Sequence, residues 1–316
     1  MIPMGELIVF ESADLIPSQW NDSSHGSVPV RCFNPALVKN GFQWIMAYRF
    51  VGPDQIRKIA LCRLTPEFKV IPNSAILFSD LIHVEGRRWF ADPRFFYLQG
   101  NCFIYWNSGW EDTFNRQFLQ QVDLSTMLPV GPAREIKLKS GQNKLEKNWM
   151  FFDESTAHAV YTVSPHCILS VDLSGLGDVM CETKTSHHWD LSAYAQKYGD
   201  LRGGCPPQKI GDRYYSLCHS VSGTEGEYRY VAAFYCFSAT SPFKPLGFSK
   251  IPLELPNPWG AVRDHPKLNP AVGEVIYPCS AYFEKGKWVI SYGINDEYCA
   301  VTQVSHDVVL QHLNQV

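Results

Sequence analysis

The sequence of 316 residues lacks several signals that would place it in a common class. It has no run of about 18 apolar residues, so we expect no membrane-spanning helix. Its 28 Lys and Arg against 31 Asp and Glu give a formal net charge of −3, which argues against a nucleic-acid-binding surface. Residues 1–6 lack the basic and apolar regions of a signal peptide, which favours a cytoplasmic protein.

The common cofactor and nucleophile motifs are also missing. None of the ten cysteines forms a CxxC pair, and most lie in apolar strand patterns, so we expect reduced thiols rather than a disulfide scaffold. We find no Gly-rich phosphate loop and no Ser-His-Asp constellation. His187 and His188 would point to opposite faces of a strand and have no suitably spaced third ligand. We therefore expect neither a metal site nor a bound cofactor.

Aromatic residues are plentiful, with 9 Trp, 15 Tyr and 19 Phe. Such a composition suits β-strands and sugar-stacking surfaces alike. Hydrophobic residues make up 45% of the chain and charged residues 19%, which excludes a disordered chain. Most aromatics should belong to the core, and four tryptophans are candidates for sugar stacking: Trp106, Trp110, Trp149 and Trp259.

A strand–turn–strand pattern recurs along the chain after an irregular segment over residues 1–27. In its first copy, a strand over 31–38 is followed by the hairpin signal Asn40-Gly41 and a returning strand over 42–49. Short helices are expected only over 191–198 and 307–313. Equivalent points in the five copies are separated by 58, 56, 57 and 73 residues: Asn34, Asp92, Asn148, Cys205 and Pro278.

Units of three or four strands at this spacing predict an all-β, five-bladed β-propeller. A β-sandwich is the main alternative, but it should not produce five matching units. We expect one domain over residues 1–316, with blades near 28–66, 88–126, 145–174, 200–248 and 272–304.

Charged residues stand in unusual places in this pattern. Asp92 and Arg94 lie among bulky apolar residues over 89–96, where charges are costly unless they are paired or functional. The first strand of each blade lines the central channel, so polar groups near blade starts would converge at one end of it, as candidate sites usually do. Seven residues at blade starts or in the closing loop meet this description: Asn34, Asp92, Arg94, Lys147, Asn148, Arg202 and Asp296.

These stretches resemble glycoside hydrolase family 130, over residues 28–304. The resemblance implies a five-bladed propeller that acts on β-mannosides by phosphorolysis or hydrolysis, with a related branch of mannosyltransferases. Ala91-Asp92-Pro93-Arg94 resembles the family's Glu-Asp-Pro-Arg signature, whose Asp is the general acid. Four other segments resemble the remaining blade motifs: Phe33-Asn34-Pro35-Ala36 with Tyr48-Arg49, residues 147–152, residues 203–207 through Cys218-His219, and residues 277–280 with 292–296.

The resemblance implies a role for each candidate residue. Asp92 would protonate the leaving oxygen of the glycosidic bond. Arg94 would orient Asp92 or a backbone carbonyl more readily than it would touch substrate. The substrate-binding candidates are Asn34, Arg49, Arg94, Asn148, Tyr292 and Asp296, and the phosphate- or anion-binding candidates are Lys147, Arg202 and His219.

Two departures from the family pattern leave the reaction open. Ala91 replaces the signature Glu, and Asp200 stands near the place where phosphorylases carry a lysine ahead of their glycines. Phosphate needs cationic donors, and a nearby carboxylate opposes its binding. The resemblance implies inverting transfer from a β-mannoside or similar hexoside, first by a phosphorylase and second by a glycosyltransferase that uses a sugar donor in polysaccharide synthesis. The co-substrate would be inorganic phosphate or a sugar-phosphate donor. A β-mannosidase-type hydrolase and a non-catalytic glycan-binding propeller remain alternatives, and an oligomer is possible.

Overall fold

The computed structural model describes residues 5–18, 20, 30–84, 86, 89–109, 114–141, 143, 146–153, 156–224, 226–260 and 267–315. These residues form mainly strands, which confirms the predicted all-β class. The two α-helices begin and end within one residue of the predicted helices: α1 (Ser192–Tyr198) and α2 (His306–His312). Two short 3₁₀ turns are η1 (Ser12–Leu15) and η2 (Phe78–Leu81). No helix in the described ranges is long and apolar enough to cross a membrane.

The strands form antiparallel groups that follow one another along the chain. The first two groups are β2 (Arg31–Asn40), β3 (Gln43–Val51), β4 (Arg57–Leu64) and β5 (Ile76–Leu77), then β6 (Ala91–Leu98), β7 (Asn101–Asn107), β8 (Gln117–Asp123) and β9 (Leu128–Leu138). The next is β10 (Met150–Asp153), β11 (Ala157–Thr162), β12 (His166–Asp172) and β13 (Val179–His187).

In the following group two short strands share one edge of a long hairpin. They are β14 (Asp200–Arg202) and β15 (Gln208–Ile210), which both pair with β16 (Arg213–Ser222), and β16 continues to β17 (Tyr228–Ser238), β18 (Pro245–Ser249) and β22 (Leu313–Gln315). The last group is β19 (Val272–Glu284), β20 (Lys287–Ile294), β21 (Tyr298–Ser305) and β1 (Ile8–Phe10).

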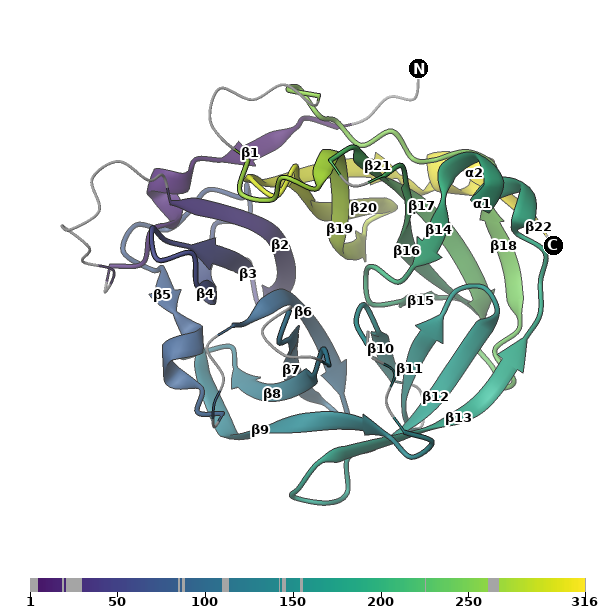
Figure 1. The fold of residues 1–316 in the computed structure, drawn as a ribbon, viewed down its shortest axis with the longest axis horizontal. Coiled ribbons are helices and arrows are strands. Elements are labelled where there is room, and N and C mark those ends of the chain that lie inside the picture. The colour runs from purple at the N-terminus through teal and green to yellow at the C-terminus, as the bar shows by residue number, and fades with distance from the viewer. Residues whose placement is uncertain are drawn as a thin grey trace.

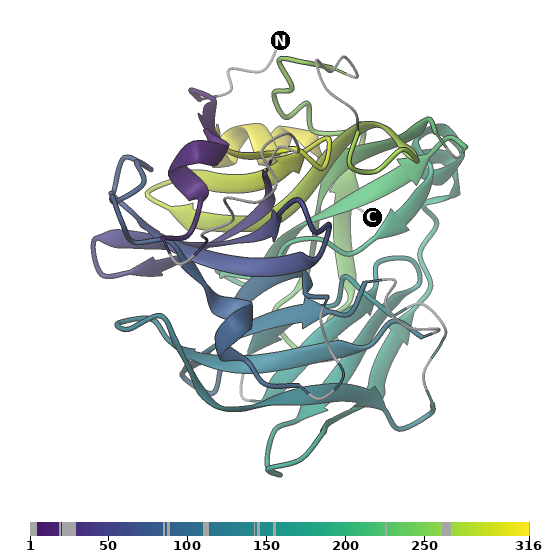
Figure 2. The same ribbon diagram turned by 60° about the vertical axis from the view of Figure 1, so that its left-hand side comes forward.

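Hydrogen bonding divides the described strands into sheets of ten, eight and four strands rather than into separate units. Neighbouring groups are joined by short parallel pairings, β13 with β9 and β17 with β19. The groups nevertheless follow one another around a common centre from purple to yellow, and the first group lies beside the last (Figure 1; Figure 2). Hydrogen bonds join these groups: for example, Leu37 N–H donates to Ser280 Oγ, and Ser291 Oγ–H donates to the Pro35 carbonyl.

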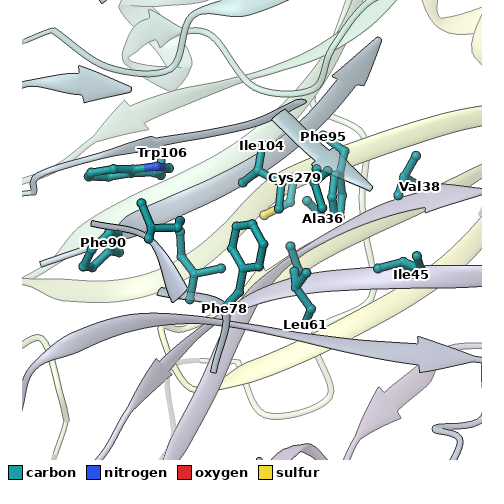
Figure 3. Packing of buried hydrophobic residues seen from close by; sticks show 14 of the residues in the cluster. Ala36, Val38, Ile45, Leu61, Phe78, Phe90, Phe95, Ile104, Trp106 and Cys279 are labelled. Atoms are coloured by element: carbon teal, nitrogen blue, oxygen red, sulfur yellow. The ribbon is translucent and has the colours of Figure 1, made fainter. Parts of the chain in front are cut away.

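The apolar core fills the space between neighbouring groups. Figure 3 shows Leu61 of β4 and Phe78 of η2 close to Ile104 of β7, with Trp106 beside Phe90. All ten cysteines are free and buried, as expected for reduced thiols that serve as small apolar side chains.

Two expectations from the sequence are wrong, one about tryptophans that stack on sugars and one about the irregular segment over residues 1–27. Trp106 and Trp149 are buried in the core, where they cannot stack on a sugar, whereas Trp259 stacks on Tyr298 and Trp110 lies outside the described residues. The segment predicted as irregular contains β1, which adds to the edge of β21 as the outermost strand of the last group. The pairing needs a partner almost 300 residues away, so no local pattern could reveal it. Residues 1–4, 19 and 21–27 of that segment are outside the described residues.

Candidate active site

Asn34 and Asp92 sit at matching β-bulges on the first strands of two neighbouring groups. The register of β2 against β3 shifts between Phe33 and Ala36, and the register of β6 against β7 shifts at Asp92. At the bulges φ is +55° for Asn34 and +53° for Asp92, a left-handed conformation that Asn and Asp tolerate better than most residues. A bulge turns its side chain away from the regular strand pattern. The two side chains meet, and Asn34 Nδ2 donates to Asp92 Oδ1 at 2.9 Å.

Asn148, the equivalent residue before β10, is fixed by its surroundings. Its φ is +64°. Its backbone N–H donates to the Tyr105 hydroxyl at 3.1 Å, and the Tyr277 hydroxyl donates to its Oδ1 at 2.6 Å. A Cβ atom at Gly203 would lie 1.9 Å from the Asn148 carbonyl oxygen, so only glycine allows this approach. Gly203, which belongs to the fourth blade motif, therefore makes room for Asn148, which belongs to the third.

A second glycine makes room for Asn34. A Cβ atom at Gly293 would lie 1.9 Å from Asn34 Oδ1. Gly293 is in β20, next to the turn that carries Asp296, whose φ is +58°. The absence of a side chain at this position brings the last group of strands against the first, and so brings Asp296 toward Asn34 and Asp92.

These side chains surround a cavity of about 500 Å³. Every group of strands contributes to its wall, for example Asn34 from β2, Asp92 from β6, Asn148 from the start of β10, His219 from β16 and Tyr277 from β19. Eight of the ten predicted site residues line it: Asn34, Arg49, Asp92, Lys147, Asn148, Arg202, His219 and Asp296.

Asp92 is a buried carboxylate held by cations. Arg49 Nη2 lies 3.3 Å from the same Oδ1 that accepts from Asn34. Burial by itself raises the pKa of Asp92, but the charges of Arg49, Arg94 and Lys147 and the Asn34 hydrogen bond outweigh it, so the pKa lies below its ordinary value. Asp92 is therefore ionised at neutral pH.

The pKa of Asp296, the other carboxyl group of the cavity, is shifted in the opposite direction. Burial raises its pKa, although Arg49 and a hydrogen bond from Asn269 Nδ2 at 3.2 Å oppose the rise. The two carboxyl groups of the cavity thus have pKa values shifted in opposite directions, a pattern common where one group keeps its charge and another exchanges a proton.

The cavity wall carries an excess of positive charge. Among the residues that the structure describes, four cationic side chains line it, from Arg49, Arg57, Lys147 and Arg202, against the two carboxyl groups of Asp92 and Asp296. The chain as a whole has a formal charge of −3, so this excess is local. Such a cavity favours an anionic ligand.

His219 adds an unsatisfied polar group to the same wall. Its side chain is fully buried, and neither ring nitrogen has a hydrogen-bond partner among the described residues. Burial, with the charges of Arg202 and Lys147, lowers its pKa well below 6.5, so the ring is a neutral imidazole. Tyr230 stacks on it, with ring centroids 5.6 Å apart. A buried polar group without a partner is costly, and a ligand in the cavity would remove that cost.

Two predicted substrate-binding residues, Arg94 and Tyr292, do not line the cavity. Arg94 is almost fully buried and donates to three backbone carbonyls, those of Pro93, Gly204 and Pro278, at 3.1 to 3.3 Å. The Tyr292 hydroxyl donates to the Pro256 carbonyl at 2.8 Å. Both side chains hold backbone segments together behind the wall. The sequence analysis expected Arg94 to orient either Asp92 or a backbone carbonyl, and its hydrogen bonds go to backbone carbonyls.

The structure adds wall residues that the sequence analysis missed. The Arg57 guanidinium carbon lies 4.5 Å from the centre of the Trp89 ring, and both line the cavity with Tyr228 and Tyr230. Residues 268–272 complete the wall. Trp89 could have been found from its place three residues before Asp92. Arg57 and the tyrosines stand in ordinary strand patterns, so only the fold shows that they face the site.

In the described parts of the chain, no group of three or more His, Cys, Asp or Glu side chains is placed to hold a metal ion. His187, considered above as a metal ligand, instead contacts the Pro242 carbonyl through Nε2 at 2.8 Å.

The sequence matches no protein-family model and no curated protein. Among solved structures, it is similar to a β-1,2-mannobiose phosphorylase from Listeria innocua, with a TM-score of 0.66 and 15% identity over 97% of this chain and 98% of that one. The chain has the fold of a mannoside phosphorylase.

Two further structures agree. One is described under the GH130 family of mannoside phosphorylases, a family that contains glycoside hydrolases that target β-1,2 mannosidic linkages in Candida mannan. Its TM-score is 0.63 at 12% identity, over 95% of this chain and 94% of that one. The other is a glycosyl hydrolase from Bacteroides ovatus, with a TM-score of 0.61 at 14% identity over 86% and 84%. The resemblance to family 130 drawn from short motifs is thus confirmed at the level of the fold.

Proposed function

We propose that this protein is a glycoside phosphorylase that acts on a β-mannoside with inversion. An oxygen of inorganic phosphate attacks the anomeric carbon, the bond to the glycosidic oxygen breaks, and that oxygen takes the proton of Asp92. The products are α-mannose 1-phosphate and a saccharide shortened by one sugar.

The observation that carries the proposal is the meeting of two sets of residues in one cavity. Asp92 stands on the wall formed by β3, β4 and β6, and the anion-binding candidates Lys147, Arg202 and His219 come from the start of β10, from β14 and from β16. A phosphate dianion would balance the local excess of positive charge and supply the missing partner of His219. A hydrolase would need no such set of cations.

The remaining wall residues suit a sugar. Asn34, Arg49, Asn148 and Asp296 present amide, guanidinium and carboxyl groups at fixed positions, and these can hydrogen-bond the hydroxyl groups of the sugar whose bond is broken. Mannose is proposed as this sugar because two of the similar structures are associated with β-1,2-mannosidic substrates.

We further propose that the strand groups are the five blades of a single propeller, each with one strand at the centre. The antiparallel pairing within each group and the circular order in Figure 1 support this reading. Ten free, buried cysteines favour a reducing compartment such as the cytoplasm.

The proposal is tested by incubating the protein with β-1,2-mannobiose and longer β-manno-oligosaccharides, with and without inorganic phosphate. We expect α-mannose 1-phosphate only when phosphate is present. Release of free mannose regardless of phosphate would contradict the proposal in favour of a hydrolase. No product in either reaction would point to a sugar-donor transferase or a glycan-binding protein.

Asp92→Asn identifies the proton donor, because it keeps the size and the Asn34 contact of the side chain but removes the proton. We expect kcat to fall by about 10²- to 10⁴-fold while phosphate still binds. Asp212→Asn, at a side chain that is 90% exposed, is the matched control and should leave activity unchanged. Equal activity of Asp92→Asn and the wild type would remove Asp92 from the mechanism.

A further inference from the structure

Trp89 places an aromatic side chain in a wall that is otherwise largely polar on its side of the cavity. It precedes β6 by two residues and is half-buried. The Phe90 N–H donates to the Arg57 carbonyl at 2.8 Å, which ties the segment to β4. A Cβ atom at Gly109, where φ is +59°, would lie 3.4 Å from Trp89 Cε3, so the turn after β7 passes close to the indole.

Arg57 fixes the orientation of the indole. Its guanidinium carbon lies 4.5 Å from the centre of the Trp89 ring, and its Nη1 donates to the Gln55 carbonyl at 2.6 Å. Cation–π contact and this hydrogen bond hold the guanidinium at the ring while leaving it other N–H groups. The pair therefore offers an aromatic surface beside charged donors, which matches the apolar C–H face and the hydroxyl edge of a pyranose.

The place of this pair in the wall indicates which sugar it meets. In a displacement with inversion, the acid and the attacking nucleophile act on opposite faces of the reacting sugar. Asp92 stands three residues after Trp89, on the same segment, whereas Lys147, Arg202 and His219 belong to other groups of strands. The leaving oxygen departs toward Asp92, so the sugar attached to that oxygen extends along the side that carries Trp89 and Arg57.

We propose that Trp89, oriented by Arg57, is the platform for the leaving-group sugar and determines which saccharide the enzyme accepts there. This assignment rests on the proposed phosphorylase activity. It makes Trp89 a residue for the acceptor in the reverse reaction, in which a sugar hydroxyl attacks α-mannose 1-phosphate and displaces phosphate. The donor is bound by the other walls of the cavity.

The reverse reaction separates the two subsites, because donor and acceptor have independent KM values. Trp89→Leu removes the aromatic face, and we expect it to raise the KM for mannose as acceptor by about fivefold or more while the KM for α-mannose 1-phosphate changes by less than about twofold. Trp89→Phe keeps a smaller aromatic face and should have an intermediate acceptor KM. Trp259→Leu, at a half-buried tryptophan outside the cavity that stacks on Tyr298, is the matched control and should leave both constants unchanged.

Two outcomes would overturn the assignment: an equal rise of both KM values in Trp89→Leu, or an acceptor KM equal to that of the wild type. Thermal unfolding of each variant shows whether it is folded. A binding titration keeps the assignment testable apart from turnover, since Trp89→Leu should weaken the binding of β-1,2-mannobiose but not that of inorganic phosphate. If the wild type forms no product with α-mannose 1-phosphate, the proposed function fails, and the titration alone decides the subsite.

Discussion

Asp92 is ionised, although its proposed role as the general acid requires a protonated carboxyl group. Arg49 and Lys147 hold its pKa below the ordinary value, and a carboxylate cannot donate a proton. The same cations belong to the wall that would bind phosphate. Once an anion neutralises them, burial is no longer outweighed, and the pKa of Asp92 rises. Binding of the anion would therefore prepare the acid.

We expect this linkage to appear as proton uptake when an anion binds. Sulfate is a suitable probe because it does not itself titrate near pH 5. Calorimetric titration with sulfate at pH 5, in two buffers of different ionisation enthalpy, should show the wild type taking up a fraction of a proton. The sign follows from the shift: the group is ionised before binding and partly protonated after it.

Two variants assign this proton. The uptake should shrink in Asp92→Asn, whose side chain cannot titrate. His219→Gln measures the share of the imidazole, whose pKa is also lowered by the neighbouring cations and would rise with an anion bound. Identical uptake by the wild type and Asp92→Asn would show that the acid is not linked to the anion.

At the scale of elements, a buried ion pair fixes one wall of the cavity. Arg31 Nε of β2 lies 2.8 Å from Glu297 Oε2, in the turn between β20 and β21, and both side chains are less than 10% exposed. The other carboxylate oxygen, Oε1, accepts from the Leu268 N–H at 3.3 Å. Glu297 thus links the first and last groups of strands to the segment 268–272 that lines the cavity.

Glu297→Leu leaves Arg31 buried without this partner, which should lower the free energy of unfolding by about 3–5 kcal/mol. The measurement is urea-induced unfolding. Arg31→Met combined with Glu297→Leu removes both charges and should lose less than either single change. If the single and double variants lose their stability additively, the pair is not a coupled unit.

The elements differ in how far they could be predicted. The hairpins could be predicted from apolar strand patterns and from turns such as Asn40-Gly41, and both helices lie within one residue of their predicted positions. The bulge at Asp92 could not be predicted, because it depends on the register against β7. The short strand β14 was missed as a strand for a similar reason, since only its pairing with β16 makes it one.

At the scale of the whole molecule, the ends of the chain complete the fold together. β1 pairs antiparallel with β21, and Gly5 N–H donates to the Gln303 carbonyl at 2.7 Å. Phe10 and Leu15 are buried in the core beside β2 and β3. Residues 5–10 thus cover the outer edge of the last group of strands, which lies beside the first group (Figure 1).

Phe10→Ala should therefore lower the free energy of unfolding by about 3–5 kcal/mol, because it empties a core position and weakens the closing strand. Urea-induced unfolding measures the loss. Leu176→Ala, at a side chain that is 95% exposed, is the control and should change stability by less than about 0.5 kcal/mol. A loss for Phe10→Ala as small as that of the control would mean that β1 contributes little to closure.

The sequence by itself determined the all-β class, the repeated strand units and eight of the residues that line the cavity. These features are encoded locally: short apolar runs form strands, turn residues join them into hairpins, and a charged residue among bulky apolar ones stands out wherever it occurs. Only the tertiary structure decided which of the polar residues face the cavity, that Arg94 and Tyr292 lie behind its wall, and that Trp89 and Arg57 meet there. Those relations depend on register, bulges and the packing of one group of strands on the next, which join residues far apart in the chain.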